Sequence, residues 1–149
     1  MAETLAKRPH GVGRIIGAGI VGGIIVDLFL ILAHVVPFPG IYMFIASGLV
    51  GPAAFTSSWY IALGIVLHLI ISIVWAAIYV FVFQQLFAKL PWWGNAVIFG
   101  VVVMLGMQVV LLGKHLEPAF PTGMGLVTNL IAHIVFFALP VAYILRNDL

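Results

Sequence analysis

Residues 15–36 read IIGAGIVGGIIVDLFLILAHVV, and they are apolar apart from Asp27 and His34. An α-helix needs about 20 predominantly apolar residues to cross the hydrocarbon core of a bilayer, so this stretch is long enough. It is too long for the core of a signal peptide, and no A-x-A-like cleavage site follows it. We therefore expect a transmembrane helix that stays in the mature protein.

Three further apolar runs follow, at residues 60–87, 96–113 and 125–145. None of them shows the period-2 alternation of a membrane β-barrel. The composition agrees, because 64% of the 149 residues are apolar and only 7% are charged, whereas about a quarter of a soluble domain is charged. The sequence predicts an all-α integral membrane four-helix bundle, a single transmembrane domain over residues 1–149, with a short N-terminal tail over residues 1–13. Its first partner is the lipid bilayer.

Several classes of protein are disfavoured by what the sequence lacks. There is no cysteine, which excludes disulfides, thiolate metal sites and redox dithiols. The net charge of +2 rests on six Lys and Arg residues without a basic run, so nucleic acid is not an expected partner. No nucleotide-binding loop or nucleophile motif is recognisable, and nothing in the sequence indicates an enzyme that acts on its own.

The cations divide unequally between the two sides of the predicted bundle. Lys114 falls on one side, and five cations fall on the other, namely Lys7, Arg8, Arg14, Lys89 and Arg146. Since Lys and Arg accumulate in cytoplasmic loops, both termini are predicted to be cytoplasmic, in a bacterial-type inner (plasma) membrane. The segment 37–58 then lies outside. Its apolar stretch is too short to span, so we expect residues 41–55 to be partly helical and packed on the outer face.

The two halves of the chain look like copies of one another. The first and third spans align at a constant offset of 81, which pairs Gly19 with Gly100, Asp27 with Gln108, and His34 with His115. The second and fourth spans align through His68 and His133, at an offset of 65 (133 − 68). Each copy holds two spans, so both point the same way. We expect two tandem parallel αα repeats related by a pseudo-two-fold axis along the membrane normal.

Polar side chains lie on one face of each predicted helix, at a spacing of about 3.6 residues. Asp27, His68 and His133 are expected at similar depths, about a third to halfway through the bilayer at 1.5 Å per residue. The other members of this polar seam are Gln108, His34, His115, Asn129 and Ser72. A charge at membrane depth costs about 2.5 kcal/mol or more, so ionisable residues there are candidates for function.

Several interpretations of this cluster remain open. His68 and His133 could be the axial ligands of a b-type haem, with nearby glycines making room for the macrocycle. His68, His133 and Asp27 could instead bind a transition-metal ion, or the polar seam could be the proton or metal-ion path of a small transporter. In the last interpretation the chain is an accessory or purely structural subunit. Its lipid-facing surfaces would then dock other membrane subunits or a second copy.

Two stretches also resemble a known family. HLIISIVWAAIY at residues 68–79 and HIVFFAL at residues 133–139 look like small bacterial inner-membrane proteins of the YagU-like kind, over roughly residues 14–145. The resemblance implies four spans with a histidine early in the second and fourth. Phe137 and Pro140 depart from it, because such chains often have small residues there. The family has no firmly assigned chemistry, so the resemblance implies the fold and the histidine positions alone.

Overall fold

The computed structural model describes residues 11–35, 37–114 and 119–146, and within these ranges the fold is all-α, as predicted. The described part contains five continuous helices. In chain order they are α1 (Val12–Leu32); α2 (Gly40–Val50), which runs on as a 3₁₀ turn (Gly51–Phe55); α3 (Trp59–Ile78), which runs through a π-helical segment (Tyr79–Phe83) into α4 (Gln84–Leu86); α5 (Trp92–Gly113); and α6 (Gly123–Ile131), which runs through a second π-helical segment (Ala132–Ala138) into α7 (Leu139–Ile144).

Four of these helices are long and apolar enough to cross a membrane, which confirms the four predicted spans. Their bounds are Val12–Leu32, Trp59–Leu86, Trp92–Leu111 and Gly123–Ile144. The remaining helix, Gly40–Phe55, is apolar but shorter, and it confirms the prediction of a helical segment between the first two spans. The chain is therefore a small multi-pass integral membrane protein.

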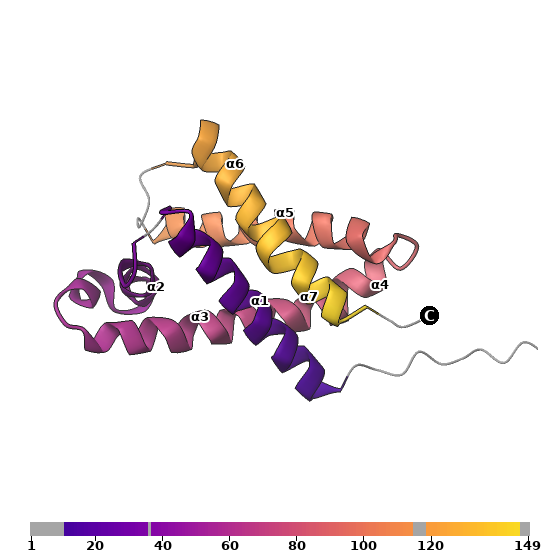
Figure 1. Ribbon diagram of the computed structural model, residues 1–149, viewed down its shortest axis with the longest axis horizontal. Helices are drawn as coiled ribbons and strands as arrows, with labels where there is room; N and C mark the ends of the chain where they lie inside the picture. Colours follow the sequence, from indigo (N-terminus) through magenta and orange to yellow (C-terminus); the bar gives the residue numbers. More distant parts are fainter. Residues whose placement is uncertain (1–10, 36, 115–118, 147–149) are drawn as a thin grey trace, which may run out of the picture.

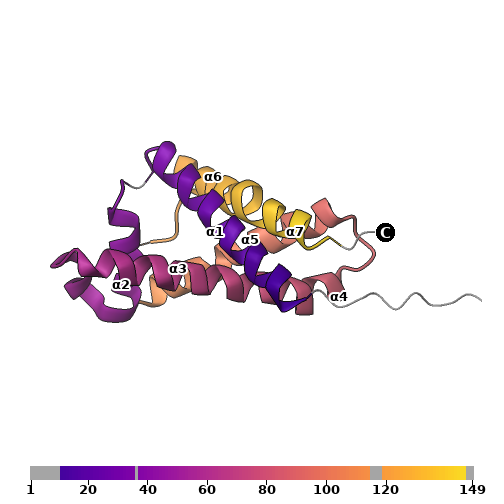
Figure 2. The ribbon, with the colours of Figure 1, turned by 60° about the horizontal axis from the view of Figure 1, so that its bottom comes forward.

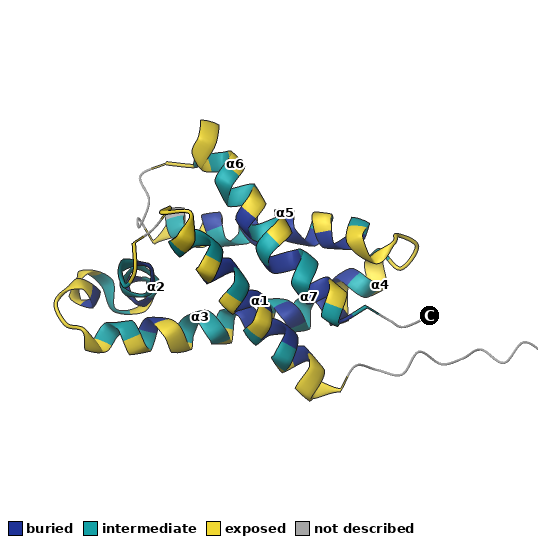
Figure 3. Ribbon diagram, viewed as in Figure 1, coloured by how far each residue is buried: buried dark blue, intermediate teal, exposed yellow. Residues whose placement is uncertain are grey.

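The four long helices cross in pairs (Figure 1). Helix α1 crosses α3, and the helix from α6 to α7 crosses α5; both crossing helices lie on the same side of α3 and α5 (Figure 2). Helix α2 lies at one end of the molecule, which we call the α2 end. Helix α1 begins, α7 ends and α4 turns into α5 at the other, which we call the terminal end. Buried residues follow the faces where helices cross, and exposed residues cover the outer faces (Figure 3).

Two helix boundaries differ from the sequence prediction for local reasons. The first span was expected to reach residue 36, but α1 ends at Leu32 because His34 adopts a left-handed conformation, with φ of 54°. The amide of Val35 donates to the carbonyl of Leu30 at 3.0 Å, which is the bond of a Schellman helix end. Helix α5 begins at Trp92 rather than at residue 96, because the carbonyl of Pro91 already accepts the first helical hydrogen bond, from the amide of Asn95 at 3.1 Å.

Glycines bring the crossing helices into backbone contact. A Cβ built on Gly19 of α1 would lie 2.5 Å from the Cα of Ile73 in α3. The second crossing has the same device, since a Cβ on Gly100 of α5 would lie 2.7 Å from the Cα of Ile134. No side chain fits at either point, so each crossing depends on its glycine, as small residues do between membrane helices.

The core nearest the terminal end is aromatic. The ring of Phe99 is fully buried and contacts Trp75, Tyr79, Phe83 and Phe137, with ring centroids 5.0 to 6.3 Å apart. Edge-to-face and tilted ring pairs of this kind add to the stability given by burial. This half of the bundle is therefore closed by apolar side chains.

We predict that Gly19→Ala destabilises the protein by about 1–3 kcal/mol, because the added methyl group would overlap the backbone of α3. Thermal unfolding in detergent measures the effect. Gly17→Ala is the matched control on the same helix, since a Cβ there meets nothing within 4 Å. The control should be neutral or slightly stabilising. Equal stability of the two variants would contradict the backbone contact.

Candidate functional site

Asp27 is a carboxylate buried inside a membrane span. It lies on α1 five residues before the end of the helix at Leu32, or about 8 Å along the axis, and only 5% of it is exposed. The chain has four acidic residues, and Asp27 is the only one within the described ranges. Because lipid cannot solvate a carboxylate, the protein itself must supply partners for it.

The first partner of Asp27 is His68 on α3, as the sequence led us to expect. The Nε2 atom of His68 lies 3.1 Å from Oδ1 of Asp27 and 3.3 Å from the carbonyl oxygen of Gly23. A carbonyl oxygen can only accept, so this contact indicates that Nε2 carries a hydrogen. That hydrogen points to Gly23, because Oδ1 of Asp27 accepts no hydrogen bond within the described residues. One carboxylate oxygen thus lies beside the imidazole with its acceptor position open.

The second partner is Tyr42 on α2, which the sequence analysis did not single out. Its hydroxyl donates to Oδ2 of Asp27 at 2.9 Å. Burial, with the charge of Asp27 and the hydrogen bond to it, raises the pKa of the Tyr42 hydroxyl to about 12, so it stays protonated and able to donate at neutral pH. The available signal was chemical: a buried carboxylate needs a donor, and Tyr42 is the polar side chain within the apolar residues 41–45.

Glycine again makes this arrangement possible. Gly64 of α3 lies directly against the backbone carbonyl of Tyr42, with no space for a Cβ between them. Helix α2 can therefore rest on α3 closely enough for the Tyr42 side chain to reach Asp27 on α1. On the other side of the site, Gly23 faces the buried hydroxyl of Ser72, whose Oγ lies 2.7 Å from where a Cβ would be.

His133 and Asn129 lie in the fourth span and form a separate local unit. The Nδ1 atom of His133 donates to the backbone carbonyl of Asn129 at 2.8 Å, so Nδ1 carries a hydrogen. His133 lies within electrostatic range of His68. Gln108 of α5 is 2% exposed, and its Oε1 has no hydrogen-bond partner among the described residues.

The haem and metal interpretations do not fit this geometry. The Nε2 atom of His68 is directed at Gly23 and Asp27, and side chains of other helices pack closely against Gly22 and Gly23. A Cβ on Gly22 would lie 2.6 Å from the side chain of Val141, so these glycines serve helix contact rather than a macrocycle. Within the described ranges, no three His, Cys, Asp or Glu side chains come together in a way that could hold a metal ion.

Of the two histidines predicted at the outer rim, His34 does not join the site. His34 is exposed, and its position is explained by its role at the end of α1. His115, predicted as its counterpart, lies outside the described residues.

Comparison with family models, curated proteins and solved structures gives no match. The function must therefore be argued from the site.

We predict that Tyr42→Phe lowers stability by about 1–3 kcal/mol, because the buried Oδ2 of Asp27 loses its donor. Thermal unfolding in detergent checks this, with Tyr60→Phe as the control, since the Tyr60 hydroxyl has no hydrogen bond within the described ranges. In the Asp27→Asn background the loss should shrink. A loss that stays the same in that background would show that the two side chains are not coupled.

Proposed function

We propose that this protein binds and releases a proton at the Asp27–His68 pair, reached from the α2 end of the bundle. The observation that carries the proposal is the open acceptor position on Oδ1 of Asp27, 3.1 Å from the imidazole Nε2. Intramembrane carboxylates and histidines commonly serve as proton relays.

The pair has two protonation states of similar geometry. In the state without the bound proton, a neutral imidazole faces a charged carboxylate; when a proton binds, it lies on Oδ1 of Asp27 and both groups are neutral. Among side chains, imidazole is the one that titrates closest to neutral pH. The close packing of Gly22 and Gly23 leaves no room for a larger ligand, and a proton needs none.

Access from the α2 end is supported by where the polar groups lie. Tyr42 of α2 covers the carboxylate on that side, so movement of α2 would open the site. Towards the terminal end, the buried ring cluster around Phe99 separates the site from the opposite surface. A transporter would have to open this cluster in a second conformation, whereas a proton sensor would not.

The internal repeat is part of this proposal, with a corrected register. The two glycine crossings pair Gly19 with Gly100 at an offset of 81 and Ile73 with Ile134 at an offset of 61 (134 − 73). The second and fourth spans then align one helical turn away from the His68–His133 match. In this register the counterparts of Asp27 and His68 are Gln108 and Asn129. The second half would carry two amides, which cannot exchange a proton at neutral pH.

Two further interpretations from the sequence remain proposals. The first is a role as an accessory subunit that packs beside other membrane subunits or a second copy. The exposed apolar outer faces could form such contacts. The second is kinship with YagU-like inner-membrane proteins, supported by the stretches 68–79 and 133–139.

We predict that Asp27 titrates inside the folded protein. Infrared difference spectra recorded across a pH series should show the carbonyl stretch of a protonated carboxyl group. The signal should vanish in Asp27→Asn and shift its midpoint in His68→Gln, because the neighbouring imidazole shares the proton. With only four acidic residues in the chain, the assignment is direct.

A control variant and a transport assay distinguish proton binding, proton transport and a purely structural contact. Asn129→Gln lies at the proposed amide counterpart of His68 and should leave the signal unchanged. Proteoliposomes with an internal pH-sensitive dye test whether the bound proton also crosses the membrane. If Asp27 shows no titration at any pH where the protein stays folded, the pair is a structural contact and the proposal fails.

The orientation yields a separate prediction. Arg14, Lys89 and Arg146 all lie at the terminal end, while Lys114 belongs to the α2 end, so we propose that the terminal end is cytoplasmic. Reporter fusions after Arg146 and within residues 37–58 should report opposite sides, with Arg146 inside. A reporter after Arg146 that is active only outside would reverse the orientation.

A further inference from the structure

A hollow lies at the terminal end, well away from the Asp27 site. Its volume is about 370 Å³. It opens between α4, the start of α5 and Arg146, which follows α7. Its lining includes Tyr79, Gln84, Asn95, Arg146 and the two indole rings of Trp92 and Trp93.

The walls of this hollow are held in place by hydrogen bonds. The amide nitrogen of Gln84 donates to the carbonyl of Leu145 at 2.6 Å, and that of Asn95 donates to the carbonyl of Phe83 at 3.2 Å. The Asn95 side chain is 4% exposed, and its Oδ1 has no partner within the described residues. The walls of the hollow are therefore fixed by these two hydrogen bonds.

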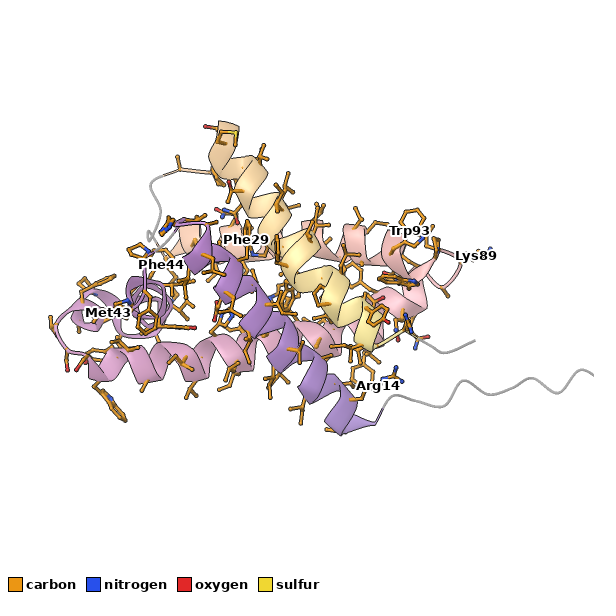
Figure 4. All side chains as sticks on the ribbon, in the orientation of Figure 1. Arg14, Phe29, Met43, Phe44, Lys89 and Trp93 are labelled. Carbon is orange, nitrogen blue, oxygen red and sulfur yellow. The ribbon has the colours of Figure 1, made fainter. Side chains whose placement is uncertain are left out.

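The charged side chains that the structure describes around the hollow are positive. Arg14 and Lys89 lie at this end together with Trp93 (Figure 4), and Arg146 lines the hollow, with its guanidinium 3.9 Å from the centre of the Tyr143 ring. Arg14 donates to the carbonyls of Ile144 and Arg146, which uses two of its five N–H donors. No carboxylate lies at this end among the described residues.

We propose that this hollow binds the headgroup of an anionic phospholipid such as phosphatidylglycerol. Arg146, with Arg14 nearby, would attract the phosphate, since basic pockets at the membrane surface recognise anionic headgroups. Trp92 and Trp93 belong to the residue type that concentrates at the level of lipid headgroups, which favours a lipid over a soluble ligand. The proposal does not depend on the proton site.

Lipid retention tests the proposal on the full chain. The protein is placed in nanodiscs of phosphatidylcholine with a minor fraction of phosphatidylglycerol, extracted gently, and its bound lipids are counted by native mass spectrometry. The wild type should retain phosphatidylglycerol in preference to phosphatidylcholine. Arg146→Gln should reduce this preference about fivefold, the effect expected for one cation near an anionic headgroup.

The controls use the other end of the molecule. Lys114→Gln removes a cation at the α2 end and should leave retention unchanged, and infrared titration of Asp27 or thermal unfolding shows that each variant is folded. Equal retention of the two lipids by the wild type would overturn the proposal. So would an equal loss in Lys114→Gln, or binding of soluble glycerol phosphate as tight as that of the lipid.

Discussion

A carboxylate in the hydrocarbon core has no water to solvate it, and much of this structure follows from meeting that requirement at Asp27. The protein brings two other helices to α1 so that His68 and Tyr42 reach the two carboxylate oxygens. Each approach needs a glycine: Gly19 and Gly23 let α3 cross α1, and Gly64 lets α2 rest on α3. The glycine positions and the polar contacts are thus parts of one arrangement.

The sequence predicted the spans well because their signal is local. About 20 apolar residues in a row define a membrane helix whatever its neighbours are, and four such runs were present. The ends of the helices were less predictable, since they depend on one residue each. His34, for example, ends α1 through a backbone conformation that is uncommon for residues other than glycine.

The site was predictable only in part. Asp27 and His68 could be paired from their depth and their helix faces, which follow from helix geometry. Tyr42 could not be added, because its position depends on how α2 folds back over the first two long helices. In the repeat that we propose from the glycine crossings, His68 pairs with Asn129, whereas the sequence alone suggested a pairing with His133, one helical turn away. Histidines are conspicuous in apolar sequence, but crossing points are fixed by close packing of small residues.

The contact between Gly64 and the backbone of Tyr42 affects how α2 can move. With no side chain between them, α2 rests directly on α3, so uncovering Asp27 would require α2 to move away from this contact. How readily α2 lifts would then decide how fast Asp27 exchanges with the outer surface. The exchange rate of the proton site would then depend on Gly64, a residue without a side chain whose nearest neighbour across the contact is the backbone of Tyr42.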